Sequence, residues 1–76
     1  MDGNLSWRAR LARKNINILN IDDHRWYYEF MYHPKYGQTK WCKTYLEVAP
    51  SSQTPEEISR QLEDEVLSLR KELENN

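Results

Sequence analysis

The chain has 76 residues, of which 38% are hydrophobic and 30% charged, and its formal net charge is -1 at pH 7. This length corresponds to one small domain, residues 1–76, and excludes a separate catalytic domain or a cage around a large cofactor. A single cysteine excludes an internal disulfide and a zinc ribbon, and no apolar run reaches the roughly 18 residues that a membrane span needs. We therefore expect a cytoplasmic protein.

Charge is distributed unevenly along the chain. Residues 1–46 carry eight basic and four acidic side chains, whereas residues 47–76 carry three basic and eight acidic ones. Such polarity can attract an anionic partner to one end, or it can hold the two halves together within a monomer or across a dimer. Because the two halves nearly cancel, we favour internal complementarity.

The first segment, residues 1–14, carries four basic side chains. Within it, helical spacing would place Trp7 and Leu11 on one side, but so short a helix is marginal when isolated. The segment is expected to be either a docked short helix or a flexible basic arm.

Residues 15–48 have the pattern of a three-stranded antiparallel sheet. Residues 15–21 are rich in β-branched side chains, and Asp22 and Asp23 mark a turn before the next strand. Residues 24–33 then alternate with a period of two, so that one face of this strand is aromatic. The members of this aromatic row are Trp26, Tyr28, Phe30 and Tyr32.

The third strand follows a segment with the composition of a turn, residues 34–37, and extends over residues 38–48. If His33 pairs with Gln38 across this four-residue loop, Trp41 and Tyr45 face the aromatic row and join it. The same register places alternate side chains on the opposite, open face of the sheet. They are Arg25, Tyr27, Glu29, Met31, His33, Gln38, Lys40, Cys42, Thr44 and Leu46.

Residues 54–74 carry the clearest local signal, which is that of a helix from about Pro55 to Glu74. Thr54 suits the N-cap, Pro55 the first helical position, and Glu57 can close a capping box. An apolar stripe with spacings of three and four follows. Its members are Ile58, Leu62, Val66, Leu69 and Leu73.

These elements predict an α+β fold of β-β-β-α order. A three-stranded antiparallel sheet carries the long C-terminal helix on its aromatic face, with a possible short N-terminal helix. In the alternative, the aromatic face stays exposed and stacks single-stranded bases. We favour the core, with Trp26, Phe30, Trp41 and Tyr45 under the helix, because the helical stripe needs an apolar surface to bury.

The residues needed for catalysis or metal binding are too few. In the expected register Cys42 faces Glu29, and neither His33 nor His24 can reach the thiol as a base. Asp22, Asp23 and His24 are better explained by a turn than by a metal site. We expect no enzyme activity, no cofactor and no bound metal.

A binding function remains, and we expect the partner to be a protein. Aromatic side chains, Met and Arg are common in protein interfaces, and the chain would act stoichiometrically as an adaptor, regulator or inhibitor. The candidate partner-binding residues are Trp7, Arg8, Arg10, Arg25, Tyr27, Met31, Tyr36, Lys40 and Leu46.

The alternative partner is a nucleic acid, bound by the open face and the basic N-terminal arm. A three-stranded sheet backed by one helix, with Arg25, Lys40 and Thr44 on its open face, resembles in outline the small domains that lay such a sheet in the DNA major groove, as the arm-binding domains of tyrosine recombinases do. That resemblance implies contacts from the open face to DNA. Glu29 and the net charge of -1 oppose it, because nucleic-acid affinity needs surplus positive charge.

Self-association is expected about as strongly as a monomer. The helical stripe is long for a narrow three-stranded sheet, so its C-terminal end would overhang. The candidate dimer seam consists of Leu67, Leu69 and Leu73.

Overall fold

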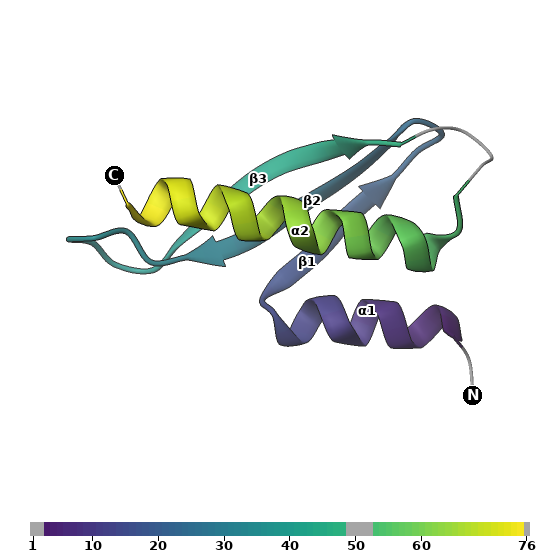
Figure 1. Cartoon of the computed structure of the whole chain (residues 1–76), viewed down its shortest axis with the longest axis horizontal. Helices are drawn as coiled ribbons and strands as arrows, with labels where there is room; N and C mark the ends of the chain where they lie inside the picture. Colours follow the sequence, from purple (N-terminus) through teal and green to yellow (C-terminus); the bar gives the residue numbers. More distant parts are fainter. Residues whose placement is uncertain (1–2, 49–52, 76) are drawn as a thin grey trace.

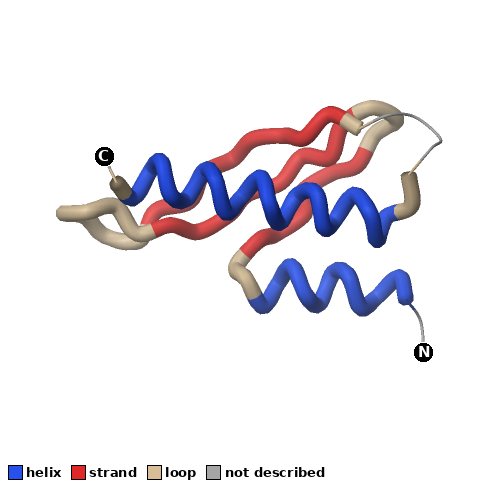
Figure 2. Tube along the Cα trace, in the orientation of Figure 1, coloured by secondary structure: helices blue, strands red, loops and turns tan. Residues whose placement is uncertain are grey.

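The computed structural model describes residues 3–48 and 53–75, with side chains from Ser6 onward in the first helix. The elements are α1 (Gly3–Arg13), β1 (Ile16–Ile21), β2 (Arg25–Tyr32), β3 (Lys40–Glu47) and α2 (Pro55–Glu74). The strands form one antiparallel sheet in the order β1-β2-β3, and the two helices lie side by side over one face of it (Figures 1 and 2). This arrangement confirms the predicted α+β fold, including its short N-terminal helix.

The aromatic row of β2 lies beneath the helices, as its alternation predicted. Trp26, Tyr28 and Phe30 are buried, the last two completely, while Tyr32 at the end of the strand is partly buried. Burial of a large aromatic ring contributes several kcal/mol to the stability of a small core. The central strand therefore supplies much of the hydrophobic core.

Helix α2 begins and ends where the sequence predicted. The Thr54 hydroxyl accepts a hydrogen bond from the Glu57 N–H, and the Glu57 carboxylate accepts one from the Thr54 N–H, which closes the capping box. Ile58, Leu62 and Val66 are buried against the sheet. The last two residues of the stripe, near the helix C-terminus, are partly buried against the same core.

The N-terminal segment is a docked helix rather than a flexible arm. Trp7 and Leu11 on one side of α1 are buried in the core, and the Trp7 ring lies 5.0 Å from the Trp26 ring. The helix ends at Arg13, and two residues later Asn15 has a φ of 60°, the left-handed conformation that Asn tolerates just after a helix. This turn brings the chain directly into β1.

The predicted register between β2 and β3 is wrong by one residue. Phe30 pairs with Cys42 and Trp26 with Leu46, because seven residues, 33–39, connect the strands instead of the four assumed. A shift of one residue moves every side chain of a strand to the other face of the sheet. Trp41 and Tyr45 therefore lie on the open face, whereas Lys40, Cys42, Thr44 and Leu46 lie on the face that the helices cover.

The pairing of β1 with β2 contains a β-bulge between Ile18 and Asn20. Beyond the bulge, Ile21 pairs with Trp26 on the helix-covered face, yet it is 40% exposed.

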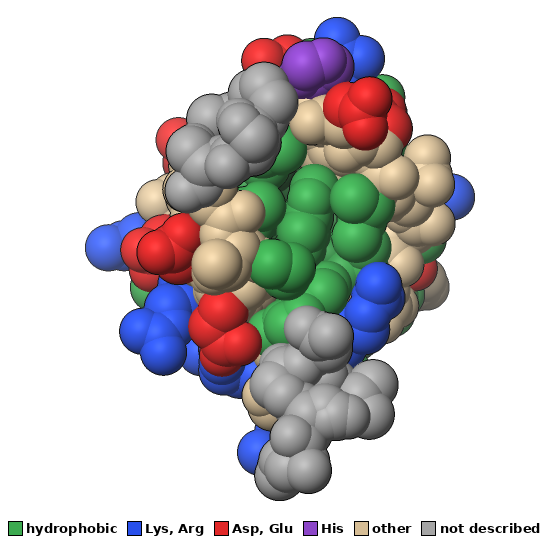
Figure 3. Space-filling model, turned by 90° about the vertical axis from the view of Figure 1, so that its right-hand side faces the viewer, with side chains coloured by type: hydrophobic (Ala, Val, Ile, Leu, Met, Phe, Trp, Pro, Cys, Tyr) green, Lys and Arg blue, Asp and Glu red, His purple; other side chains and the backbone are tan. Residues whose placement is uncertain are grey.

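Figure 3 views the end of the molecule where both helices begin, and hydrophobic side chains gather at its centre within a rim of polar and charged ones. The core thus reaches the surface at this end.

Candidate functional site

The open face of the sheet, which is the face that the helices leave uncovered, is the candidate site. β2 and β3 place their odd-numbered residues there, because each of these strands alternates without a bulge and odd residues pair with odd residues. Trp41 and Tyr45 are 46% and 47% exposed. The open face of these two strands consists of Arg25, Tyr27, Glu29, Met31, Trp41, Lys43, Tyr45 and Glu47.

Three side chains form an aromatic and cationic cluster on this face, toward the end where β2 begins and β3 ends. Tyr27 and Tyr45 are paired residues whose rings lie 5.7 Å apart at an angle of 44°. The Arg25 guanidinium lies 5.2 Å from the centre of the Tyr45 ring and within 3.4 Å of the Tyr27 hydroxyl. Such cross-strand contacts hold rigid rings in place at low entropic cost, which favours binding.

The charges of the open face are balanced. Arg25 forms an ion pair with Glu47 at 3.6 Å, and Lys43 is the cross-strand partner of Glu29. Glu29 also accepts a hydrogen bond from Asn17 of β1 at 3.2 Å. Each cation of β2 and β3 on this face thus lies beside a carboxylate, which leaves the aromatic surface without a surplus of positive charge.

The other residues predicted for partner binding are scattered. Tyr36 is 92% exposed in the loop between β2 and β3 and belongs to neither strand. Lys40 and Leu46 lie on the helix-covered face because of the corrected register, and Leu46 is buried there. Trp7 is buried in the core, and Arg8 lies over its ring at 4.7 Å on the outer side of α1. Of the predicted set, the open face brings together Arg25, Tyr27 and Met31.

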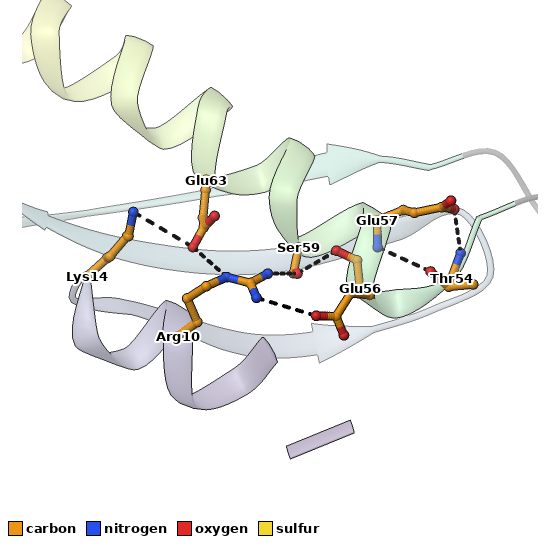
Figure 4. A network of polar contacts seen from close by, with 7 residues as sticks. All are labelled: Arg10, Lys14, Thr54, Glu56, Glu57, Ser59 and Glu63. Atoms are coloured by element: carbon orange, nitrogen blue, oxygen red, sulfur yellow. Dashed lines mark hydrogen bonds and ion pairs between the residues drawn. The ribbon is translucent and has the colours of Figure 1, made fainter. Parts of the chain in front are cut away.

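Arg10 makes an internal contact between the helices (Figure 4). Its guanidinium donates hydrogen bonds to the Ser59 hydroxyl at 2.8 Å and to the Glu63 carboxylate at 3.0 Å, and it also contacts Glu56 at 3.4 Å. Lys14 adds a longer contact to Glu63 at 3.9 Å. The basic first half and the acidic last helix therefore attract each other within one molecule, which is the internal complementarity expected from the sequence.

The predicted dimer seam on α2 is mostly covered by the chain itself. Leu69 and Leu73 are partly buried against the core, and only Leu67, at 68%, is among the exposed large hydrophobic residues. One exposed leucine does not make an apolar patch of the size typical of interfaces.

The Asp22 side chain builds a turn. Its carboxylate accepts hydrogen bonds from the N–H groups of His24 at 2.9 Å and Arg25 at 2.8 Å. The bond from His24, followed by that from Arg25, lowers the pKa of Asp22 below its usual value. Asp22 thus has a structural role between β1 and β2, as its Asx chemistry suggested.

Among the described residues, the side chains considered for catalysis or metal binding lie apart from one another. Cys42 pairs with Phe30, not with Glu29 as the assumed register implied, and it is packed against the core. Within residues 3–48 and 53–75, no three His, Cys, Asp or Glu side chains are grouped closely enough to hold a metal ion. In the same part of the chain, neither helix is sufficiently long and apolar to cross a membrane.

The sequence prediction missed Trp41, Lys43, Tyr45 and Glu47 as open-face residues. The alternation of β3 does separate Trp41, Lys43 and Tyr45 from Cys42, Thr44 and Leu46, but it does not by itself say which of the two sets faces the core. Comparisons with protein-family models, with curated proteins and with solved structures each found no match. A function must therefore be inferred from the residues of this chain.

Proposed function

We propose that the chain binds another protein stoichiometrically through the open face of its sheet, as an adaptor, regulator or inhibitor. The observation that supports this proposal is the row of ordered aromatic side chains on that face, Tyr27, Tyr45 and Trp41, of which the last two are half exposed. Tyr and Trp anchors on a rigid element are frequent centres of binding energy in protein interfaces.

The charge balance favours a protein over a nucleic acid. A nucleic-acid surface gains most of its affinity from Lys and Arg side chains that neutralise phosphates. Here Arg25 lies beside Glu47, and Lys43 lies opposite Glu29, so the carboxylates would repel phosphates at the same positions. A protein surface with mixed charges and apolar side chains is a better match.

The test is to immobilise the full chain and to identify the macromolecules that it captures, with nuclease present and at both low and high salt. We expect one protein to be captured at a fixed stoichiometry, and to be lost with Trp41→Ala or Tyr45→Ala. Leu67→Ala is the control, because Leu67 is an exposed apolar residue on α2, on the opposite side of the sheet. Retention of the captured protein by both open-face variants would contradict the proposal.

Binding of single-stranded nucleic acid is a second candidate function, and the exposed rings of Trp41 and Tyr45 favour it because bases stack on such rings. It predicts binding that weakens steeply with salt and is lost with the double substitution of Arg25 and Lys43 by Ala. Salt-tolerant capture of a protein, unaffected by nuclease, would exclude it as the explanation.

The proposed role is non-catalytic and cytoplasmic. Support comes from the single, packed thiol of Cys42 and from the structural role of Asp22 in its turn. A purified chain that turned over a substrate would contradict this part of the proposal.

A further inference from the structure

The outer side of β3 forms one edge of the sheet. β3 is the last strand of the sheet, and no other strand in the described part of the chain pairs with its outer side. It extends over eight residues, Lys40–Glu47, with an unbroken register and no proline. The opposite edge differs, since β1 carries a bulge between Ile18 and Asn20 and has α1 packed beside it.

The direction of the backbone N–H and C=O groups along β3 follows from the hydrogen bond that continues the pairing of β2 with β3. The Val48 N–H donates to the His24 carbonyl at 2.9 Å, so the backbone of Val48 points toward β2. Antiparallel strands alternate the direction of their N–H and C=O groups from residue to residue. The backbone groups of Lys43, Tyr45 and Glu47 therefore point outward, and their side chains lie on the open face.

We propose that two copies of the chain pair through β3, in antiparallel orientation about a two-fold axis at Tyr45, and form a six-stranded sheet. In this register Tyr45 pairs with its own copy, and Lys43 of each chain pairs with Glu47 of the other. The outward N–H and C=O groups of these three residues then satisfy one another. This proposal concerns the chain alone and does not depend on the proposed function.

Charge complementarity selects both the second copy as the occupant and the register. Within one chain, Glu29 pairs with Lys43 and Arg25 with Glu47. When the two β3 strands pair, each pair becomes part of a row of four charged side chains across the sheet. The row runs from Glu29 and Lys43 of one chain to Glu47 and Arg25 of the copy, so that negative and positive charges alternate. Opposite charges directly across a strand pair stabilise it, and like charges destabilise it.

Neighbouring registers lack this match. An axis at Lys43 would place the two lysines opposite each other, which is unfavourable. An axis at Thr44 would pair Lys43 with Tyr45 and Trp41 with Glu47, so no cation would face a carboxylate. Only the axis at Tyr45 gives two ion pairs around a central aromatic pair.

The helices leave room for this pairing. α2 packs over β2, and α1 lies on the β1 side of the sheet (Figure 1). In the paired sheet the two β2 strands are three strand spacings, about 14 Å, apart, and this is also the separation expected where each α2 passes over its own β2. That separation exceeds the roughly 8–10 Å at which helices pack.

Charge reversal tests the register. In sedimentation at micromolar concentration we expect a dimer for the wild type, and a dissociation constant raised about tenfold or more by Lys43→Glu or by Glu47→Lys. The double variant should regain the dimer, because it restores both intermolecular pairs. The double variant does not restore the charge pairs within one chain, since it places Glu opposite Glu29 and Lys beside Arg25. Recovery of the dimer would therefore report the contacts between the two chains. Circular dichroism confirms that each variant is folded.

A cysteine cross-link provides the second measurement. With Cys42 replaced by Ser, Tyr45→Cys places two thiols across the axis with Cα atoms about 5.5 Å apart, which permits a disulfide. Trp41→Cys in the same background is the control, because the two positions would lie roughly 27 Å apart. We expect mild oxidation to give a covalent dimer for position 45 alone.

Three results would overturn the proposal. The first is a monomeric mass for the folded wild type at about 100 µM, and the second is a dimer that the charge reversals leave unchanged. The third is loss of the dimer with Leu67→Glu but not with the β3 variants, which would place the interface on α2. If the chain stays monomeric and instead captures an extended peptide at β3, its mass is the monomeric one named first, and the proposal is wrong.

Discussion

The indole rings of Trp7 in α1 and Trp26 in β2 pack against each other with centroids 5.0 Å apart and planes inclined by 39°. Both rings are 4% exposed, so this contact attaches the N-terminal helix to the central strand. The helix is therefore part of the core and contributes to the stability of the whole domain.

Removal of the Trp7 ring is expected to destabilise the fold strongly. Trp7→Ala should lower the free energy of unfolding by about 3–5 kcal/mol, because it deletes a buried aromatic ring and leaves a cavity. Trp26→Ala should cost a similar amount. Chemical denaturation measures both, and Arg13→Ala, at an exposed position of α1, is the control, with an effect of about 0.5 kcal/mol or less. A wild-type midpoint for Trp7→Ala would show that α1 is not docked.

The contact of Arg10 with α2 is expected to contribute less. Arg10→Ala should cost about 1–2 kcal/mol, because its hydrogen bonds to Ser59 and Glu63 are lost from a partly exposed site. Arg13→Ala, in the same helix and exposed, is the control. A double-mutant cycle with Glu63→Gln should give a coupling energy, and additive effects would contradict the contact.

Tyr28 is expected to make stability fall at alkaline pH. Burial, followed by the charges of Glu65 and Cys42, raises the pKa of Tyr28 from 10.0 to about 12. The unfolded chain therefore releases this proton at lower pH than the folded one. The stabilising effect is complete below pH 10 and is lost as the pH rises to about 12, by at most about 1.4 kcal/mol per pH unit.

Tyr28→Phe separates this effect from the titration of the other tyrosines. The variant should show a flatter decline of unfolding free energy between pH 10 and 12. At neutral pH it should be at least as stable as the wild type, because the buried Tyr28 hydroxyl has no hydrogen-bond partner among the described residues. An unchanged alkaline profile would show that Tyr28 ionises as it does in the unfolded chain.

Two adjacent residues of β3 test the observed register. Leu46→Asp should unfold the domain, since it buries a carboxylate beneath the helices, whereas Tyr45→Asp should leave it folded because Tyr45 is 47% exposed. Thermal melting followed by circular dichroism distinguishes the two variants. The opposite result would restore the register first expected from the sequence.

The sequence determined α2 well because its signals are local. Thr54, Pro55 and Glu57 act within one turn, and the apolar stripe requires no knowledge of distant segments. The aromatic row of β2 was equally readable, since one face of that strand is much more apolar than the other.

The register of β3 could not be determined by the same means. Both of its faces contain side chains that a core accepts, Trp41 and Tyr45 on one and Cys42 and Leu46 on the other, so the pattern alone does not choose between them. The choice depends on the length of the loop over residues 33–39. The Gly37 N–H does bond to the Pro34 carbonyl at 3.2 Å, but this turn lies inside a longer loop and does not join the strands directly. The register of β3 in turn decides which of its side chains lie on the open face.

The guanidinium of Arg70 in α2 donates hydrogen bonds to the carbonyl groups of Met31, at the end of β2, and of Lys14, just after α1. Together with the contacts of Arg10, it joins the first helix of the domain to the last. During synthesis, the ribosome would release α1 and the whole sheet before α2 had emerged from its exit tunnel. The aromatic row of β2 would meanwhile be exposed to other hydrophobic surfaces, and the domain would close only when the twenty residues of α2 arrived.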